Sequence, residues 1–120
     1  MKIVITSQGG NIESPVDPRF GRAAWFLVYD SETGAHRVLE NTQSASAAQG
    51  AGIKAAETVS HLGAEVVITG HCGPKAFHTL RSAGIQVVLG AEGTIAGVLE
   101  GFKSGRLKPS SSPDVDGHWQ

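Results

Sequence analysis

The fold is constrained most strongly by two predominantly apolar runs in the second half of the chain, separated by a segment of helical pattern. The runs span residues 66–69 and 85–89, and the helical pattern spans residues 75–83. Apolar runs of this length, without a regular polar alternation, are typical of strands buried on both faces of a sheet. Neighbouring strands that are joined through a helix run parallel to each other, whereas antiparallel neighbours can be joined by a tight turn. The sequence therefore predicts a parallel crossover, with both strands in the middle of a mixed sheet.

The first forty residues predict an antiparallel part of the same sheet. Runs of strand character span residues 3–6, 25–29 and, more weakly, 37–40. The linker at residues 30–34 is short and rich in turn-forming residues, which favours a hairpin between the last two runs. The predicted fold class is therefore α/β, a five-stranded mixed sheet with an N-terminal antiparallel part and three helices.

The three predicted helices have apolar side chains spaced three and four residues apart, the spacing of an amphipathic helix. The first spans residues 47–62. The second, residues 75–83, follows Pro74, which suits the first turn of a helix. The third, residues 94–103, begins at Thr94, a good N-cap residue.

Length and composition fit one hydrophobic core. A length of 120 residues with 40% hydrophobic and 18% charged residues is typical of a single globular domain. We expect this domain over residues 1–107. From residue 108 the sequence is rich in Pro, Ser and Asp and has no period. Residues 108–120 are therefore predicted to form a flexible C-terminal tail.

Charge and cysteine content exclude several classes of function. Ten Lys and Arg against eleven Asp and Glu leave a formal charge of −1, which predicts no general affinity for nucleic acid or for anionic membranes. The chain opens in a strand-like run without a signal-peptide pattern, so we expect a cytoplasmic protein. The single cysteine, Cys72, excludes an internal disulfide and a four-cysteine metal site within one chain.

Glycine-rich loops follow both apolar strands. In parallel sheets, ligands bind beyond the carboxyl ends of the strands, where the first amide groups of the following helices point outward. Residues 70–74 and 90–93 fall at this edge, and residues 49–52 lie near the start of the first helix. Capping and turn formation explain any one of these loops, but their coincidence favours a pocket for an anion.

A second candidate feature is the cationic segment at residues 17–22, Asp-Pro-Arg-Phe-Gly-Arg. Arg19 and Arg22 could form a guanidinium clamp for an anion, with Phe20 shielding one side. The alternatives are an ion pair between Asp17 and an arginine within the loop, or ordinary solvated charges.

The dipeptide His71-Cys72 contains metal-ligating residue types, but neither a CxxC nor an HExxH pattern accompanies it, so a zinc enzyme is not predicted. A lone cysteine is more often a small buried hydrophobe than a ligand. At the start of a helix, however, its thiolate should be favoured, which keeps a nucleophilic role open. Such a role would require a neighbouring base and an orienting residue.

Three segments resemble the NifX-like carrier domains of the dinitrogenase iron–molybdenum cofactor biosynthesis family. They are residues 17–23 after an N-terminal strand, residues 69–77 (Thr-Gly-His-Cys-Gly-Pro-Lys-Ala-Phe) and the closing residues 84–87. The resemblance covers about residues 1–107. It implies a ribonuclease H-like fold that lacks nuclease activity and holds a preformed metal–sulfur cluster without covalent bonds. The cluster would be a molybdenum–copper sulfide or a related molybdenum/iron–sulfur cluster. The implied binding residues are Arg19, Phe20, Arg22, Gly70, His71, Cys72, Gly73, Pro74 and Lys75, with Cys72 and His71 in contact with the metal.

The sequence therefore predicts a non-catalytic carrier of an anionic metal–sulfur cluster. In this hypothesis the two arginines neutralise the cluster, the turn at residues 70–75 donates amides, and Phe20 and Phe77 restrict water. One cysteine suffices because inorganic sulfide supplies the soft ligands. A Cys72-dependent enzyme acting on a small anion and a regulatory interaction module are the alternatives. The family also implies cluster-assembly proteins or P-loop ATPases as partners. Every version of the carrier hypothesis requires residues 17–22 and 70–75 to converge on a shared cavity.

Overall fold

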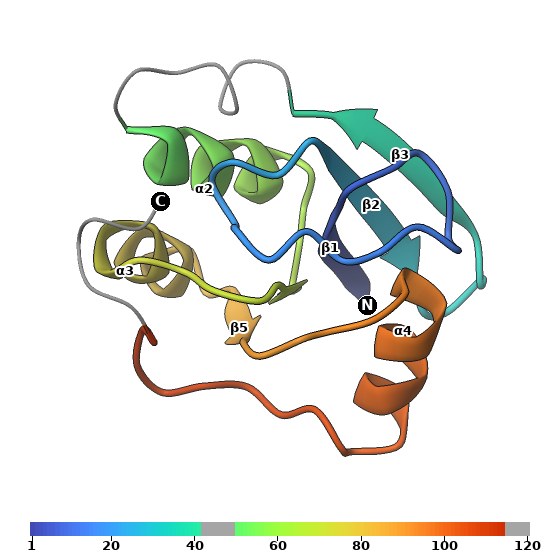
Figure 1. Cartoon of the computed structure of the whole chain (residues 1–120). Coiled ribbons are helices and arrows are strands. Elements are labelled where there is room, and N and C mark those ends of the chain that lie inside the picture. The colour runs from blue at the N-terminus through green and yellow to red at the C-terminus, as the bar shows by residue number, and fades with distance from the viewer. Residues whose placement is uncertain (42–49, 115–120) are drawn as a thin grey trace.

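The sheet combines an antiparallel half and a parallel half, which confirms the predicted fold class. The computed structural model describes residues 1–41 and 50–114. Their strands and helices, labelled as in Figure 1, are β1 (Lys2–Ser7), β2 (Trp25–Asp30), β3 (His36–Glu40), α2 (Ala51–His61), β4 (Val66–Ile68), α3 (Pro74–Ser82), β5 (Gln86–Val88) and α4 (Ile95–Lys103). Each lies within a few residues of its predicted range, although residues 47–49 of the first predicted helix fall outside the described residues.

The strands follow the order β3-β2-β1-β4-β5, so the central strand is β1. It pairs antiparallel with β2, which forms the predicted hairpin with β3, and parallel with β4, which pairs parallel with β5. The prediction that both apolar strands lie in the middle of the sheet is right for β4 and wrong for β5, the edge strand. An apolar run indicates that a strand is buried, but it does not indicate how many strands pair with it. Val87 and Val88 in β5 are fully buried although the strand is at the edge.

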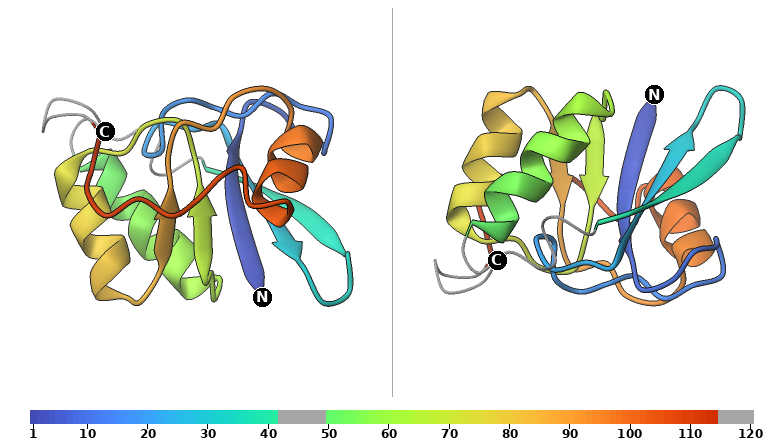
Figure 2. Two further views of the ribbon diagram at one scale, coloured as in Figure 1. Left: turned by 90° about the horizontal axis from the view of Figure 1, so that it is seen from below. Right: turned by 90° about the horizontal axis from the view of Figure 1, so that it is seen from above.

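Side chains on the two faces of the sheet pack against different helices. Val4, Val28 and Val67 face α2 and α3, whereas Ile3, Ile5 and Ile68 face α4. The alternation along β1 follows from the two-residue period of a strand. Figure 2 shows α2 and α3 on one side of the sheet and α4 on the other. No helix formed by the described residues is both long enough and apolar enough to span a membrane.

The edge of β5 is covered by the segment that the sequence predicts to be a flexible tail. Pro109 forms an antiparallel bridge with Val88, and the amide of Ser110 donates to the carbonyl of Val87 over 2.7 Å. Residues 109–114 thus lie against the domain, which differs from the prediction, and residues 115–120 fall outside the described residues. The difference arises because an edge strand offers unpaired amide and carbonyl groups to any extended segment that reaches it.

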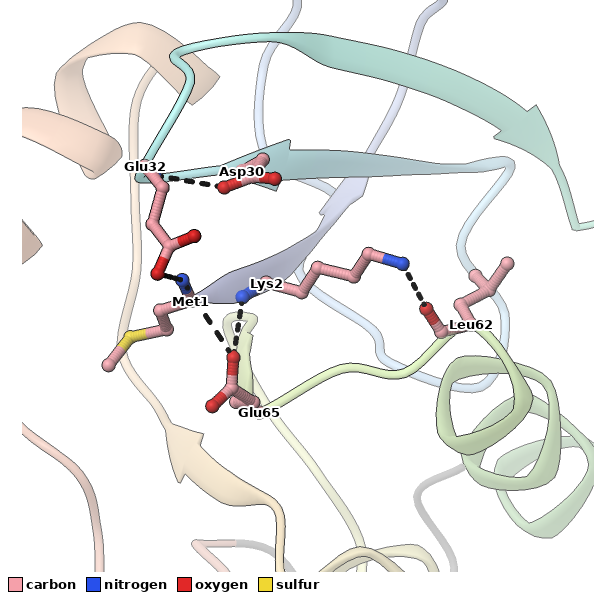
Figure 3. Close-up of polar contacts among 6 residues, drawn as sticks. All are labelled: Met1, Lys2, Asp30, Glu32, Leu62 and Glu65. Atoms are coloured by element: carbon pink, nitrogen blue, oxygen red, sulfur yellow. Dashed lines mark hydrogen bonds and ion pairs between the residues drawn. The ribbon is translucent and has the colours of Figure 1, made fainter.

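Polar contacts at the amino end of β1 join this strand to the hairpin and to the end of α2. The amide of Lys2 donates to Glu65 over 2.9 Å, and Lys2 Nζ donates to the carbonyl of Leu62 over 3.2 Å. The terminal amine of Met1 lies 4.0 Å from Glu32 and 3.9 Å from Glu65, as Figure 3 shows. These two carboxylates are largely exposed, so the ion pairs contribute little to stability. The contacts lie at the end of the sheet opposite the carboxyl edge.

Candidate functional site

The segment that contains the two arginines crosses the carboxyl ends of β1 and β4. The amide of Asp17 donates to the carbonyl of Thr6 over 2.9 Å, and the carbonyl of Asp17 accepts from the Thr6 hydroxyl over 2.8 Å. The hydroxyl oxygens of Thr6 and Thr69 lie 2.8 Å apart and connect the ends of the two strands. All three residues are buried. The segment is therefore fixed on the edge where the sequence predicts a ligand site.

Backbone hydrogen bonds join the arginine segment directly to the turn that precedes α3. The amide of His71 donates to the carbonyl of Pro18 over 2.7 Å, and the amide of Phe20 donates to the carbonyl of His71 over 3.1 Å. Arg19 and His71 are consequently partners in a parallel bridge. The two segments therefore meet, which confirms that part of the prediction, whereas the surface hollow described below lies away from both segments. We call residues 17–22 together with residues 70–75 the carboxyl-edge corner.

Gly70 permits this close approach. A Cβ atom at this position would lie 2.8 Å from both the Cα and the carbonyl oxygen of Pro18. Atoms essentially never approach so closely, and the obstructing atoms are backbone rather than the end of a flexible side chain. Only glycine therefore fits at position 70 while the two segments stay paired.

Asp17 shapes the arginine segment through main-chain contacts. Its buried carboxylate accepts hydrogen bonds from the amide of Arg19 over 3.1 Å and from the amide of Ala24 over 3.3 Å. These bonds hold the turn in which Arg19 is exposed and Arg22 is half-buried. Asn41 adds a bond to the carbonyl of Ala23 over 2.9 Å. The cationic side chains are thus displayed on a rigid loop.

Phe20 has a different role from the predicted one. Its side chain is fully buried in the core between the sheet and the helices α2 and α3, and its ring centroid lies 6.4 Å from that of Phe26. Its ring therefore anchors the loop and presents no surface to a ligand. The sequence prediction failed because an aromatic residue between two arginines has the same local pattern whether its ring points outward or inward.

The start of α3 presents backbone amides at the corner. Gly73 is the N-cap and has no side-chain cap, Pro74 begins the helix, and Lys75 is exposed in its first turn. The amide of Cys72 donates to Asp114 Oδ1 over 3.1 Å, and Asp114 Oδ2 lies 2.8 Å from His71 Nδ1. Sequence reasoning missed Asp114, since no motif surrounds this residue and 42 positions separate it from Cys72. Its carboxylate shows that the corner accepts an anionic group.

The side chains of His71 and Cys72 lie in different environments. The imidazole of His71 is 43% exposed, whereas Cys72 is 1% exposed and packs in the same core cluster as Phe20 and Phe77. Burial, and secondarily the negative charge of Asp114, raise the pKa of the Cys72 thiol from an ordinary 9.0 to about 12. The expected activation of the thiol by the start of α3 is therefore outweighed by desolvation. This weakens the alternative of a Cys72-dependent enzyme.

We accordingly expect the Cys72 thiol of the folded protein to react slowly with iodoacetamide. Thiolate is the reactive form, so a raised pKa lowers the labelling rate at pH 8.5 by about a hundredfold or more relative to the unfolded chain. Labelling from pH 7 to 11, followed by mass spectrometry with and without denaturant, measures this rate. Rapid labelling of the folded protein below pH 8.5 would restore the nucleophile hypothesis.

The second predicted glycine-rich loop, residues 90–93, does not open onto free helix amides. The first amides of α4 donate within the protein, from Ile95 to the carbonyl of Ser14 and from Ala96 to that of Ile12, each over 3.0 Å. The amide of Gly97 donates to the hydroxyl of Thr94, the predicted N-cap. The expectation of an anion site at this second loop is therefore not met.

The third glycine-rich segment lies partly outside the described residues, which resume at Gly50, the N-cap of α2. The starts of α2 and α3 lie at the same end of the molecule (Figure 1), and both N-caps lack a side-chain cap. The start of α3, which belongs to the corner, favours an anion there, because a helix dipole is positive at that end.

Two further observations limit the kind of binding site that the corner can form. Among residues 1–41 and 50–114, no group of three or more His, Cys, Asp and Glu side chains is arranged to hold a metal ion. A surface hollow of about 200 Å³ lies elsewhere, at the end of the hairpin near the amino end of β1, and contains no predicted site residue. Its lining residues are Lys2, Val28, Asp30, Thr33, Ala35, His36 and Arg37. A metal-containing ligand at the corner would therefore have to bring most of its own metal ligands.

The fold and the corner together define a small α/β domain with a cationic loop held against an amide-presenting helix start. The chain belongs to the dinitrogenase iron-molybdenum cofactor family, whose model matches residues 1–105. Its structure is similar to that of the apo form of the orange protein from Desulfovibrio gigas, with 39% identity, a TM-score of 0.93 and coverage of 95% of this chain and 96% of that one.

Two more relatives extend the comparison. The NMR structure of a Thermotoga protein of the DUF35 family has 32% identity and a TM-score of 0.82, over 95% of this chain and 97% of that one. An uncharacterized protein from Methanocaldococcus jannaschii is 28% identical over 105 residues, which covers 81% of this chain and 88% of the relative. The resemblance inferred from the motifs is thus confirmed over nearly the whole chain.

Proposed function

We propose that this protein binds and carries an anionic metal–sulfur cluster at the carboxyl-edge corner. Membership of the family supports a role in iron–molybdenum-cofactor biosynthesis, and we propose that this role is binding rather than catalysis. The observation that supports the site is the pairing of the Pro18–Phe20 backbone with His71, because this pairing brings Arg19 to the start of α3.

The corner suits an anion that brings its own soft ligands. Arg19 and Lys75 are exposed and Arg22 is half-buried, so three cationic side chains belong to the two paired segments. The Cys72 amide and the half-exposed His71 imidazole add directional donors. Inorganic sulfides accept hydrogen bonds and satisfy thiophilic metals, so the protein need only neutralise and orient the cluster. In this arrangement Cys72 contributes its backbone amide, while its thiol stays in the core.

The cargo that we propose first is a molybdenum–copper sulfide cluster, with a related molybdenum/iron–sulfur cluster as the second choice. Thiomolybdate is a compact anion whose sulfides bind copper(I), so the assembled cluster has an outer surface of acceptors that matches the donors of the corner. The match to the iron-molybdenum cofactor family supports molybdenum as one of the metals. We further propose a cytoplasmic location, with cluster-assembly proteins or P-loop ATPases as delivery partners.

Reconstitution tests the proposal. Anaerobic incubation of the purified protein with tetrathiomolybdate and copper(I), followed by gel filtration, should yield protein with a visible charge-transfer band and with molybdenum, copper and sulfide in fixed ratio. The same mixture incubated with an unrelated α/β protein of similar charge controls for adventitious uptake. Protein that leaves the column colourless and metal-free would contradict the proposed function.

A further inference from the structure

The segment at residues 109–114, which we call the C-terminal strap, connects the edge of the sheet to the carboxyl-edge corner. It runs beside β5 through Pro109 and Ser110 and reaches the start of α3 with Asp114. The left view of Figure 2 shows this segment, drawn in red, running from α4 across the strands towards α3. The strap lies outside residues 1–105, which match the family model, so family membership says nothing about its role.

Asp114 uses both carboxylate oxygens on groups of the corner. Oδ1 accepts from the Cys72 amide over 3.1 Å, and Oδ2 lies 2.8 Å from His71 Nδ1. A carboxylate at the start of a helix is stabilised by the local positive potential and by charge-assisted hydrogen bonds. These donors are the ones that an anionic cluster would use at the same place. The Asp114 carboxylate therefore occupies the position that the proposed function gives to the cargo.

We propose that Asp114 is a built-in competitor for the anion site, and that the C-terminal strap is displaced when anionic cargo binds. This inference rests on the proposed function, since the cargo is the anion proposed there. The Cys72 amide has one hydrogen to donate, so the Asp114 carboxylate and a cargo sulfide cannot both receive it. Two anions placed side by side would also repel each other. Cargo and Asp114 therefore exclude one another at this position.

Release of the strap should require little free energy. Its residues are exposed or half-buried, and the Asp114 side chain is 31% exposed, so water competes for its contact with His71. The bond from Ser110 to Val87 attaches the strap to β5 and lies away from the corner. A closed strap that occupies about nine-tenths of the molecules lowers the apparent affinity for cargo about tenfold. Disruption of either the Asp114 contacts or the hydrogen bond from Ser110 to Val87 should therefore raise the apparent affinity for cargo by about the same factor.

The experiment is an anaerobic titration of the full-length protein with the mixture of tetrathiomolybdate and copper(I), followed by its visible absorbance. Asp114→Asn, which weakens the carboxylate contacts, should bind about tenfold more tightly than the wild type. Glu57→Gln, which changes the net charge equally at an exposed position of α2, should bind as the wild type does.

A charge-neutral pair of variants separates displacement from simple electrostatics. Ser110→Pro removes the amide that donates to Val87 and leaves Asp114 intact, whereas Ser110→Ala keeps that amide and removes only the hydroxyl. Displacement predicts tighter binding by Ser110→Pro and unchanged binding by Ser110→Ala. Thermal melting of each variant confirms that the domain is folded.

Each other outcome overturns the proposal in a recognisable way. If Ser110→Pro binds as the wild type does, Asp114 acts through its charge alone and the strap is not displaced. If Asp114→Asn binds more weakly, the carboxylate is a contact for the cargo and not its competitor. If both variants match a wild type that takes up cargo, the strap proposal fails while the proposed function stands. If neither the wild type nor any variant takes up cargo, both fail together.

Discussion

Gly70→Ala is expected to lower the free energy of unfolding by about 1–3 kcal/mol, the range for forcing extra atoms into closely packed positions. The new Cβ would lie 2.8 Å from the Cα and carbonyl oxygen of Pro18. Relief of this clash requires the two segments of the corner to separate, which breaks the 2.7 Å bond from the His71 amide to Pro18. Stability and cargo binding should therefore fall together.

Urea denaturation followed by circular dichroism measures the effect, with Gly10→Ala as the matched control. A Cβ at Gly10 would meet only the Trp25 side chain, at an ordinary distance of 3.8 Å. We expect this control to change the free energy of unfolding by less than about 0.5 kcal/mol. Equal stability of the two alanine variants would show that the Pro18 backbone does not approach residue 70 as closely as the structure has it.

Replacement of Arg19 or Arg22 with alanine should weaken cargo binding by roughly tenfold to a hundredfold, the range for losing one charge-assisted contact. Arg19 is exposed and belongs to the bridge with His71, so its loss should leave the fold intact while removing charge from the corner. Lysine at the same position keeps the charge but not the planar fork, so Arg19→Lys should show an intermediate loss.

The arginine prediction is measured by the same absorbance titration, with Arg81→Ala as the control. Arg81 is exposed in the last turn of α3, so this variant changes the net charge equally at the opposite end of that helix. A loss of affinity confined to the corner variants supports the clamp. Similar affinities for Arg19→Ala, Arg22→Ala and Arg81→Ala would refute it.

The strands and helices could be predicted from the sequence because their signals are local. The apolar runs of β4 and β5, the short linker of the hairpin and the N-cap Thr94 each depend on a few neighbouring residues, and the structure has them where expected. The position of β5 at the edge of the sheet could not be predicted in this way. Edge and centre differ in long-range pairing, and the segment at Pro109 covers the edge beside Val88, which is fully buried.

The site was predictable to a similar degree and for similar reasons. The rule that ligands bind at the carboxyl edge identified residues 70–74 as a candidate loop. The carrier hypothesis assumed that residues 17–22 meet this loop, and the backbone bonds between Pro18, Phe20 and His71 show that they do. The burial of Phe20 and of the Cys72 thiol depends on packing partners far along the chain. Asp114 reaches the corner through a segment whose composition indicates disorder when it is read without the edge of β5 beside it.

The central claim is that this chain holds a metal–sulfur anion in the cell, and the most direct test is elemental analysis of protein purified anaerobically from its native host grown with molybdenum. We expect molybdenum and acid-labile sulfide to elute with the protein in constant ratio, and this material to be depleted when the host instead expresses Arg19→Ala. Native protein that is pure, folded and free of both molybdenum and labile sulfide would contradict the claim.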